Sequence, residues 1–238
     1  MNYQFFKQNS EGRDFICGDV HGYFNILEMQ LKKQAFNPAI DRVFSVGDLI
    51  DRGRGSADVL EWLEKPWFHA IQGNHERMLI KVVETKSKEL RQQWNNWGGI
   101  WARSLDYTAL QVFYDKIINM PAAIEVEIAH GQSVGLVHAE LPDQCDWLEV
   151  KTMLLEASDK NNIEDNPAIS DLFWKRAQPF FDDIKKQQVE PVKNIFHVFH
   201  GHTPIKAYTS IANRTFLDLG SYKTGLIGLI DIQDFLFN

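Results

Sequence analysis

The sequence has few cysteines, no excess of positive charge and no long apolar run. Only two of its 238 residues are cysteine, and these two, Cys17 and Cys145, do not form a CxxC pair. Cys17 ends a short apolar stretch, so we expect a small buried hydrophobe rather than a metal ligand. Residues 1–7 lack the apolar core of a signal peptide. The sequence therefore predicts a protein of the reducing cytoplasm.

The charge balance and the hydropathy of the chain disfavour nucleic acids and membranes as partners. The chain carries 25 basic and 32 acidic residues, a net charge of −7, which disfavours a nucleic-acid partner because phosphate backbones attract basic faces. A small phosphorylated substrate held by a few local cations stays compatible with this charge. No apolar run is long enough to span a bilayer, so no membrane partner is expected. The 44% hydrophobic content allows a substantial core.

The first third of the chain alternates between strand and helix patterns. We predict strands at 14–17, 42–46 and 67–72, and helices at 23–35, 56–64 and 78–88. Three strand–loop–helix units in succession favour parallel pairing with helices over the faces of the sheet. In such sheets the loops at the carboxyl ends of the strands build the functional site.

The remainder of the chain changes from helical to β patterns. Residues 89–114 are expected to be helical with a break at Gly98-Gly99, and we interpret Trp94, Trp97 and Trp101 as packing residues, with a binding role as the alternative. Hairpins are predicted at 121–138 and 207–219, further strands at 194–199 and 226–232, and two or three helices with a loop over the site at 148–188. We expect an α/β fold in which two sheets pack face to face with helices outside, in one domain spanning residues 1–238.

Polar residues with metal-ligating groups follow most of the predicted strands. They are Asp19 and His21, then Asp48, Asn74, His138 and His202. Six ligands are too many for one tetrahedral zinc ion but suit two ions that share a carboxylate, for which Asp48 is the natural bridge. Two such ions can hold a water-derived nucleophile and a phosphoryl oxygen, and the mixture of oxygen and imidazole ligands suits manganese, iron or zinc.

Three residues near these ligands have side chains suited to phosphate-ester chemistry. His75 follows Asn74 directly and could protonate a departing alkoxide. Asp51 could hold the imidazolium of His75 by a hydrogen bond and raise its pKa. Arg52 could bind phosphate oxygens with its forked guanidinium.

The segments GDVHG at 18–22, GDLIDRG at 47–53 and GNHE at 73–76 resemble the three signature motifs of the phosphoprotein phosphatase family of metallophosphatases. VHA at 137–139 is similar to the fourth motif and GHTP at 201–204 to the last. The length and the GHTP segment resemble the bacterial and phage branch of that family. These five motifs occur in the family order and extend from residue 18 to residue 204. The resemblance therefore covers nearly the whole chain.

The resemblance implies a calcineurin-like fold, with a central two-sheet β-sandwich flanked by α-helices, and two divalent metal ions. Manganese is our first choice, and iron, zinc, nickel or cobalt also fit. Asp19, His21 and Asp48 would hold one ion; Asp48, Asn74, His138 and His202 would hold the other. His75 with Asp51 would be the acid pair, and Arg52 and Arg176 would bind phosphate, Arg176 because WKR at 174–176 resembles the branch's Trp-x-Arg segment. Trp97 departs from the branch, which often has Asn at this position.

The expected activity is that of a metal-dependent phosphatase acting as a monomer on phosphorylated Ser or Thr in proteins, and also on phosphotyrosine or small phosphoesters. A symmetrical diadenosine tetraphosphate hydrolase is the alternative, because those enzymes look similar across the same motifs. A catalytically silent phosphate-binding module is a third hypothesis. We expect His200 not to ligate metal, Glu76 to begin a helix, and Arg77 to be a surface residue or to contact an acidic substrate.

Overall fold

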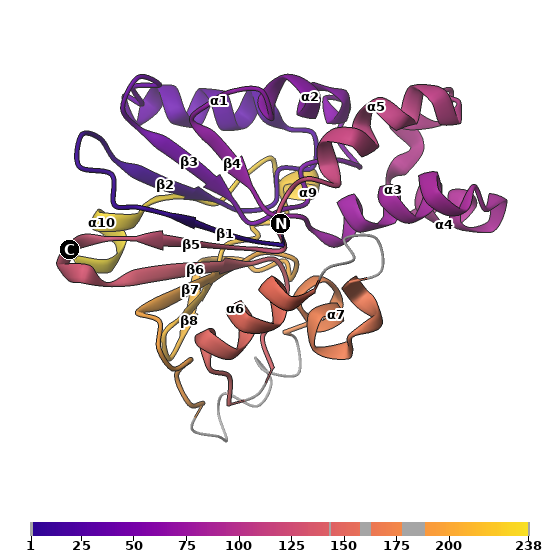
Figure 1. Ribbon diagram of the computed structural model, residues 1–238. Coiled ribbons are helices and arrows are strands. Elements are labelled where there is room, and N and C mark those ends of the chain that lie inside the picture. Colours follow the sequence, from indigo (N-terminus) through magenta and orange to yellow (C-terminus); the bar gives the residue numbers. More distant parts are fainter. Residues whose placement is uncertain (1, 143, 158–162, 178–188, 238) are drawn as a thin grey trace.

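The computed structural model describes residues 2–142, 144–157, 163–177 and 189–237. Within these ranges the chain forms a four-stranded and a six-stranded sheet that pack face to face, as predicted. Figure 1 shows helices over the two outer faces and a further group of helices at one end. None of the helices in the described ranges combines the length and the apolar character needed to cross a membrane.

The first sheet has the order β10-β2-β3-β4. Its strands are β2 (Asp14–Cys17), β3 (Arg42–Ser45), β4 (Phe68–Ala70) and β10 (Leu229–Asp231). β2, β3 and β4 are parallel, as the strand–loop–helix repeats predict, and β10 is antiparallel to β2. The connections contain α1 (Phe24–Lys33), the 3-10 helix η1 (Ser56–Asp58) and α2 (Val59–Trp62).

The second sheet has the order β1-β5-β6-β7-β9-β8. Its strands are β1 (Tyr3–Phe6), β5 (Ala123–Glu127), β6 (Ser133–Val137), β7 (His197–His200), β8 (Thr209–Ile211) and β9 (Arg214–Phe216). The two predicted hairpins, β5–β6 and β8–β9, are confirmed. β1 was not predicted; it pairs in parallel with β5, and Tyr3 lies opposite Ala123.

Three apolar layers hold the sheets and helices together. Between the sheets lie fully buried side chains from both, including Ile16, Phe44, Ile124, Leu136 and Phe199. α1 and α2 cover the outer face of the first sheet, and α6 (Trp147–Glu156) covers the second (Figure 1). Burial of each such side chain contributes about 1.5–3 kcal/mol to stability, so the central sandwich supports the loops at its end.

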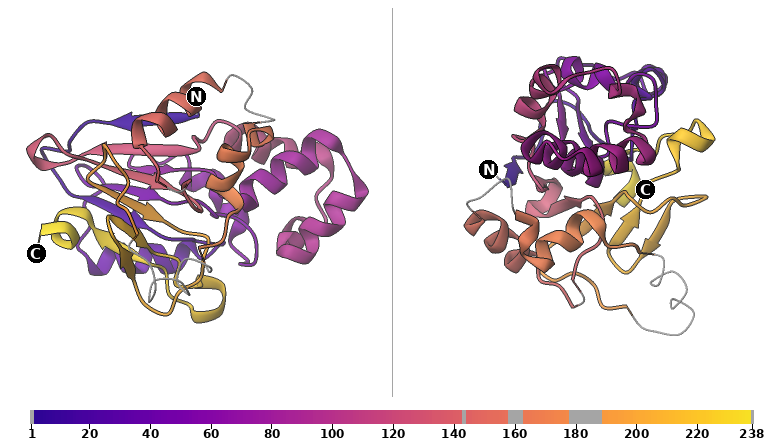
Figure 2. Two further views of the ribbon diagram at one scale, coloured as in Figure 1. Left: turned by 90° about the horizontal axis from the view of Figure 1, so that it is seen from below. Right: turned by 90° about the vertical axis from the view of Figure 1, so that its right-hand side faces the viewer.

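The remaining helices lie mostly at the end of the sandwich opposite the C-terminus (Figure 2). They are α3 (Asn74–Thr85), α4 (Lys88–Trp97), η2 (Gly99–Ala102), α5 (Tyr107–Ile117), η3 (Ala129–Gly131), η4 (Ile163–Asp165), α7 (Pro167–Trp174), α9 (Ser221–Thr224) and α10 (Ile232–Phe237). The predicted break at Gly98-Gly99 is confirmed, and α6 and α7 fall in the segment predicted to hold two or three helices. Residues 158–162 and 178–188 of that segment lie outside the described residues.

Candidate active site

The predicted site residues lie at the carboxyl ends of strands from both sheets. Asp19 and His21 follow β2, Asp48 follows β3, and Asn74 begins α3 directly after β4. From the second sheet, β6 leads into His138, and β7 is followed by His202. Because β2, β3 and β4 are parallel to one another, as are β6 and β7, their carboxyl ends carry these residues to one place.

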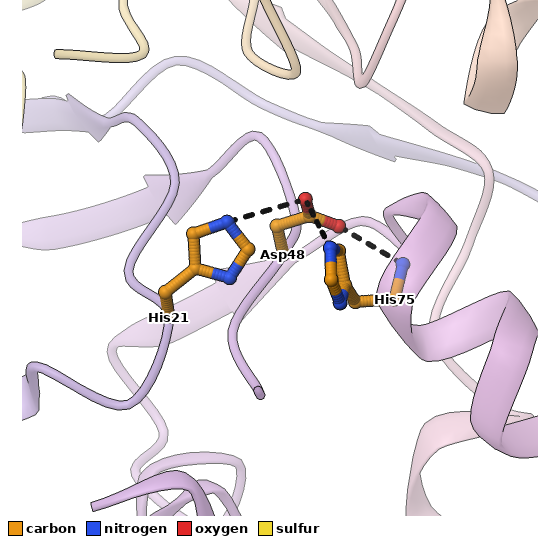
Figure 3. A group of neighbouring side chains, drawn as sticks. All are labelled: His21, Asp48 and His75. Carbon is orange, nitrogen blue, oxygen red and sulfur yellow. Dashed lines mark hydrogen bonds and ion pairs between the residues drawn. The ribbon is translucent and has the colours of Figure 1, made fainter. Parts of the chain in front are cut away.

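The Asp48 carboxylate is the centre of this cluster. Its Oδ2 lies 3.5 Å from His21 Nε2 and 3.9 Å from His75 Nε2, and its Oδ1 lies 3.3 Å from His138 Nε2. Figure 3 shows the His21 and His75 rings on two sides of this carboxylate. Burial would raise the pKa of Asp48, but the surrounding imidazoles of His138, His75 and His21 lower it well below its usual range. Asp48 is therefore an ionised carboxylate with imidazoles on several sides.

The imidazole nitrogens are arranged as they are in metal sites. His21 Nδ1 lies 3.0 Å from the Ile50 carbonyl oxygen, and His138 Nδ1 lies 2.7 Å from that of Val46. A carbonyl only accepts, so each Nδ1 donates and each Nε2 keeps its lone pair, which is the form of imidazole that ligates a metal ion. Burial lowers the pKa of both rings, which keeps them neutral and able to ligate. These residues fit divalent ions.

The structure offers two groups of three ligands that share Asp48. One is His21, Asp48 and His75; the other is Asp48, His138 and His202. Asn74 Oδ1 lies 2.8 Å from His202 Nδ1 and 3.1 Å from His138 Nε2, so this predicted ligand is next to the second group. A shared carboxylate between two groups is the arrangement expected for a pair of ions.

Asp19 lies beside the first group rather than within it. Its Oδ2 is 4.0 Å from His21 Nε2, and its carboxylate accepts a hydrogen bond from the His202 backbone N–H at 3.2 Å. Burial, Asp218 and Asp48 raise its pKa. All six predicted ligands are thus close together, and His75, predicted to face the leaving group, also lies within reach of the first ion.

Asp218 is a buried acid that the sequence analysis missed. Only 1% of its surface is exposed, and burial together with the charge of Asp48 raises its pKa to about 6. Its carboxylate accepts a hydrogen bond from the Gly220 N–H at 2.8 Å. The residue lies inside the segment 207–219 that we predicted as a hairpin, whereas β9, the second strand of that hairpin, ends at Phe216. A lone Asp at the end of an apolar stretch was the signal that could have indicated it.

His75 and Asp51, which we predicted to act as an acid pair, are in direct contact. His75 Nδ1 lies 2.6 Å from Asp51 Oδ2, and Asp51 is completely buried. Two indoles also donate to this carboxylate: Trp94 Nε1 to Oδ2 at 2.7 Å and Trp101 Nε1 to Oδ1 at 2.6 Å. Burial would lower the pKa of His75, but Asp48 and then Asp51 raise it. The interpretation of Trp94 and Trp101 as packing residues is therefore incomplete, because both also bind the Asp51 carboxylate.

The two predicted phosphate-binding arginines line one cavity of about 400 Å³. The Arg52 guanidinium lies 2.8 Å from His21 Nε2 and 3.1 Å from His75 Nε2, and it stacks over the Tyr222 ring at 4.0 Å. Arg176 donates to the His202 carbonyl oxygen at 2.5 Å. The cavity is open to a ligand that could contact both guanidinium groups; its remaining walls are formed by Asn74, His75, Asn96, Trp97, Trp174, His202 and Tyr222.

Glu76 holds together the loops that carry the ligands. It lies in the first turn of α3, as expected, but its fully buried carboxylate accepts hydrogen bonds from four backbone N–H groups at 2.8–3.2 Å. The donors are Asp48, Leu49, Ile50 and Gly73. Burial and the charge of Asp48 raise the pKa of Glu76 to about 7. The prediction that Glu76 lies at the start of a helix is confirmed. Its hydrogen bonds to the loop that carries Asp48 were not predicted.

The backbone at the site is locally strained. Five of the predicted site residues have left-handed conformations with φ between 48° and 74°: His21, Asp48, Asp51, Arg52 and His202. Two glycines allow close approach, since a Cβ on Gly73 would lie 2.2 Å from Asp48 Oδ1 and one on Gly201 would lie 2.2 Å from Asp19 Oδ1. Non-glycine residues adopt positive φ only where surrounding contacts hold them, which is typical of functional sites.

Two further expectations can be compared with the structure. His200 is absent from both ligand groups; its Nδ1 lies 2.7 Å from the Ala139 carbonyl oxygen and its ring stacks on Phe216, as expected for a residue that does not ligate metal. Arg77 is not a surface residue: it is completely buried and its Nε lies 3.0 Å from Glu164 Oε2. It connects α3 to η4 and is shielded from solvent, so that prediction is wrong.

Known proteins are similar to this chain in sequence and in fold. Serine/threonine-protein phosphatase 2 of Escherichia coli K12 is 28% identical over 225 residues, which cover 92% of each chain. A symmetrical bis(5'-nucleosyl)-tetraphosphatase of Serratia proteamaculans is 40% identical over 70 residues, 29% of this chain and 25% of that protein. The solved structure of a cold-active protein tyrosine phosphatase superimposes with a TM-score of 0.60 at 18% identity, covering 98% of this chain and 76% of that one, which supports the fold alone.

The family follows from a match that covers most of the chain. The profile described as calcineurin-like phosphoesterase matches residues 15–226, a span that contains all the candidate ligands and both arginines. The predicted resemblance and the predicted fold class are confirmed by this match together with the enterobacterial relative. This chain belongs to the calcineurin-like phosphoesterases, a family of metal-dependent hydrolases.

Proposed function

We propose that the protein is a phosphoprotein phosphatase that hydrolyses phosphorylated Ser and Thr, and also phosphotyrosine and small phosphoesters. The main support is the shared Asp48 carboxylate, with imidazoles at 3.3–3.9 Å on several sides, beside a cavity that two arginines line. The 92% coverage of a relative named as a serine/threonine phosphatase supports the same choice of substrate.

In this proposal Asp19, His21 and Asp48 hold one ion, and Asp48 with three residues of the second group holds the other, namely Asn74, His138 and His202. Two divalent ions, when bound, supply a water of lowered pKa and stabilise negative charge on the phosphoryl oxygens. Manganese is the proposed metal, because the ligands combine carboxylate and amide oxygens with imidazole nitrogens.

The other residues bind the substrate and move a proton. Arg52 and Arg176 bind the phosphate oxygens from two walls of the cavity, which orients phosphorus toward Asp48. His75 donates a proton from Nε2 to the departing serine or threonine oxygen, while its Nδ1 stays bound to Asp51. Because a serine alkoxide is a poor leaving group, this proton transfer carries a large part of the rate.

A symmetrical diadenosine tetraphosphate hydrolase is the second candidate function. The observation that favours it is the 40% identity to a protein of that name, although the match spans only 70 residues. Both functions use the same ligands and differ in what the cavity walls accept beyond the phosphate. We rank the phosphatase first, because its relative aligns over 92% of this chain, whereas the tetraphosphatases align over 29–60% of it.

A turnover panel tests the proposal. The full chain loaded with manganese is incubated separately with a phosphoseryl peptide and with diadenosine tetraphosphate, and inorganic phosphate and ADP are measured. We expect phosphate release from the peptide, which is lost on chelation and restored by manganese. Rapid formation of ADP with slow release of phosphate from the peptide would reverse the ranking. Absence of turnover with every divalent metal would refute both functions.

We also propose the domain organisation, the oligomeric state and the cellular compartment of the protein. We infer that residues 1–238 form one domain that acts as a monomer in the cytoplasm. Cys17 and Cys145 are both buried free thiols, which is compatible with a reducing compartment. Size-exclusion chromatography with light scattering would give a single species of 27.5 kDa if the protein is a monomer.

A further inference from the structure

The cavity beside the candidate ligands has a partly aromatic wall. Trp97 is the last residue of α4 and Trp174 the last of α7; their ring centroids are 6.1 Å apart with an interplanar angle of 57°. Tyr222 from α9 lines the same cavity. Three aromatic side chains from three helices thus surround a space that also contains both arginines.

Trp97 differs from the neighbouring tryptophan of its helix in its exposure. Trp94 is completely buried and bonded to Asp51, whereas 41% of the Trp97 surface is exposed. Part of the Trp97 ring is therefore in water, and a ligand in the cavity would cover some of that surface. Burial of aromatic surface against another ring is favourable both by area and by ring–ring contact.

The backbone fixes Trp97 close to the phosphate-binding group. The Arg52 N–H donates to the Gly98 carbonyl oxygen at 2.9 Å, so the residue after Trp97 is bonded directly to the arginine. Gly98 has φ of 124°, and a Cβ there would lie 2.7 Å from Arg52 Cγ, so the close contact requires glycine. Trp174 is fixed as well, because its indole donates to Glu164.

This arrangement favours a ring attached directly to the phosphate. The two arginines, His75 and the aromatic residues all line one cavity of about 400 Å³. A phosphate placed between the arginines would bring the ring of an aryl ester against the tryptophans, whereas the single carbon of a phosphoserine side chain would leave them in water. The base of a dinucleotide lies farther from the scissile phosphate, across a ribose and further phosphates.

We propose that the Trp97–Trp174 wall recognises aryl phosphoesters, and that phosphotyrosyl side chains are preferred substrates of this site. The inference rests on the proposed phosphatase function and adds the class of side chain that the cavity selects. Trp97 is the specificity-determining residue, because it combines large exposure with direct attachment to the Arg52 loop.

The first test compares two peptides of one sequence that differ only in carrying phosphotyrosine or phosphoserine. In the manganese-loaded protein, Trp97→Leu should lower the phosphotyrosine/phosphoserine ratio of kcat/KM roughly three- to tenfold, the loss expected for one aromatic pair. Trp97→Phe keeps a ring and should preserve the ratio. Trp67→Leu, a matched change of a tryptophan outside the cavity, should also leave it unchanged.

The second test separates recognition from catalysis. Phenylphosphonate and methylphosphonate cannot be hydrolysed, and their dissociation constants for the manganese-loaded protein are measured by calorimetry. We expect phenylphosphonate to bind more tightly than methylphosphonate, and Trp97→Leu, but not Trp97→Phe or Trp67→Leu, to reduce this preference roughly three- to tenfold. That result would support recognition of the ring by the Trp97–Trp174 wall even if no phosphopeptide were turned over. Equal binding of the two phosphonates, or an unchanged ratio of kcat/KM in Trp97→Leu, would overturn the inference. If Trp97→Leu lowered only the turnover of diadenosine tetraphosphate, the wall would recognise a nucleobase and the inference would be overturned.

Discussion

Replacing Asp51 with asparagine tests how the proton donor is built. The carboxylate accepts three hydrogen bonds at 2.6–2.7 Å, from His75, Trp94 and Trp101. An amide has one accepting oxygen and no negative charge, so Asn cannot accept from all three donors and no longer forms an ion pair with protonated His75. We expect kcat/KM for a phosphoseryl peptide to fall about 10²–10⁴-fold, the contribution of a positioned general acid.

The same substitution should move the alkaline limb of the pH profile. His75 donates only when protonated, so its contribution is present at pH below its pKa and is lost as the pH rises through it. Its pKa is raised by Asp48 and then by Asp51, although burial opposes both. Removing one opposite charge within about 4 Å lowers such a pKa by about 1–3 units. In Asp51→Asn the alkaline limb of kcat/KM should therefore shift to lower pH by about that amount.

The assay is phosphate release from phosphoseryl and aryl substrates across the pH range, with thermal unfolding to verify the fold. Asp106→Asn is the matched control: Asp106 is exposed and caps α5 by accepting from the Ala109 N–H at 2.8 Å, a role that Asn fills equally well. The aryl ester should lose less activity, because its leaving group needs less protonation. An alkaline limb at the same pH in the variant and the wild type would refute the assignment of His75 and Asp51 as the acid pair.

Three further predictions concern the metals and the buried charges. Chelation should abolish hydrolysis, and elemental analysis should find two ions per chain when activity returns; full activity with one ion would contradict the shared carboxylate. Glu76→Gln removes one oxygen that accepts two of the four backbone N–H groups, so urea unfolding should show a loss of about 2–6 kcal/mol, absent in the exposed Glu149→Gln control. Glu164→Ala leaves the buried Arg77 charge without this partner, and a loss of about 3–5 kcal/mol is expected by the same method; a loss below about 1 kcal/mol would show that other contacts of Arg77 neutralise it.

The ligands could be predicted because each follows a recognisable strand. Asp48 and His138 are far apart in the chain, yet their carboxylate and imidazole lie 3.3 Å apart. The sequence indicates this, since polar residues and glycines follow apolar segments and parallel strands end at the same edge. The alternation of strand and helix predicted the first sheet for the same reason.

The predictions that were wrong or incomplete concern residues whose contacts in the fold are distant in the sequence. β1 has only four residues, and its partner β5 begins at Ala123, so no local pattern marks it as a strand. Arg77 follows a motif that carries chemistry, and only the fold reveals that Glu164 neutralises it. Trp94 and Trp101 pack like core residues, and their hydrogen bonds depend on a loop some 43 and 50 residues earlier. Indoles serve both purposes, and spacing along a helix cannot separate them.

The strain at the site could not be predicted either, and the buried Glu76 carboxylate lies next to the strained loop that carries Asp48. Each non-glycine residue at positive φ costs of the order of 1–3 kcal/mol, and His21, Asp48, Asp51, Arg52 and His202 all have such φ values. Hydrogen bonds from the Asp48 loop to the Glu76 carboxylate offset part of that cost. A carboxylate is suited to this role because it accepts several N–H groups at once without donating any. The ligand geometry around Asp48 therefore depends on a residue that we expect to touch neither metal nor substrate, so Glu76→Gln should weaken manganese binding as well as the fold.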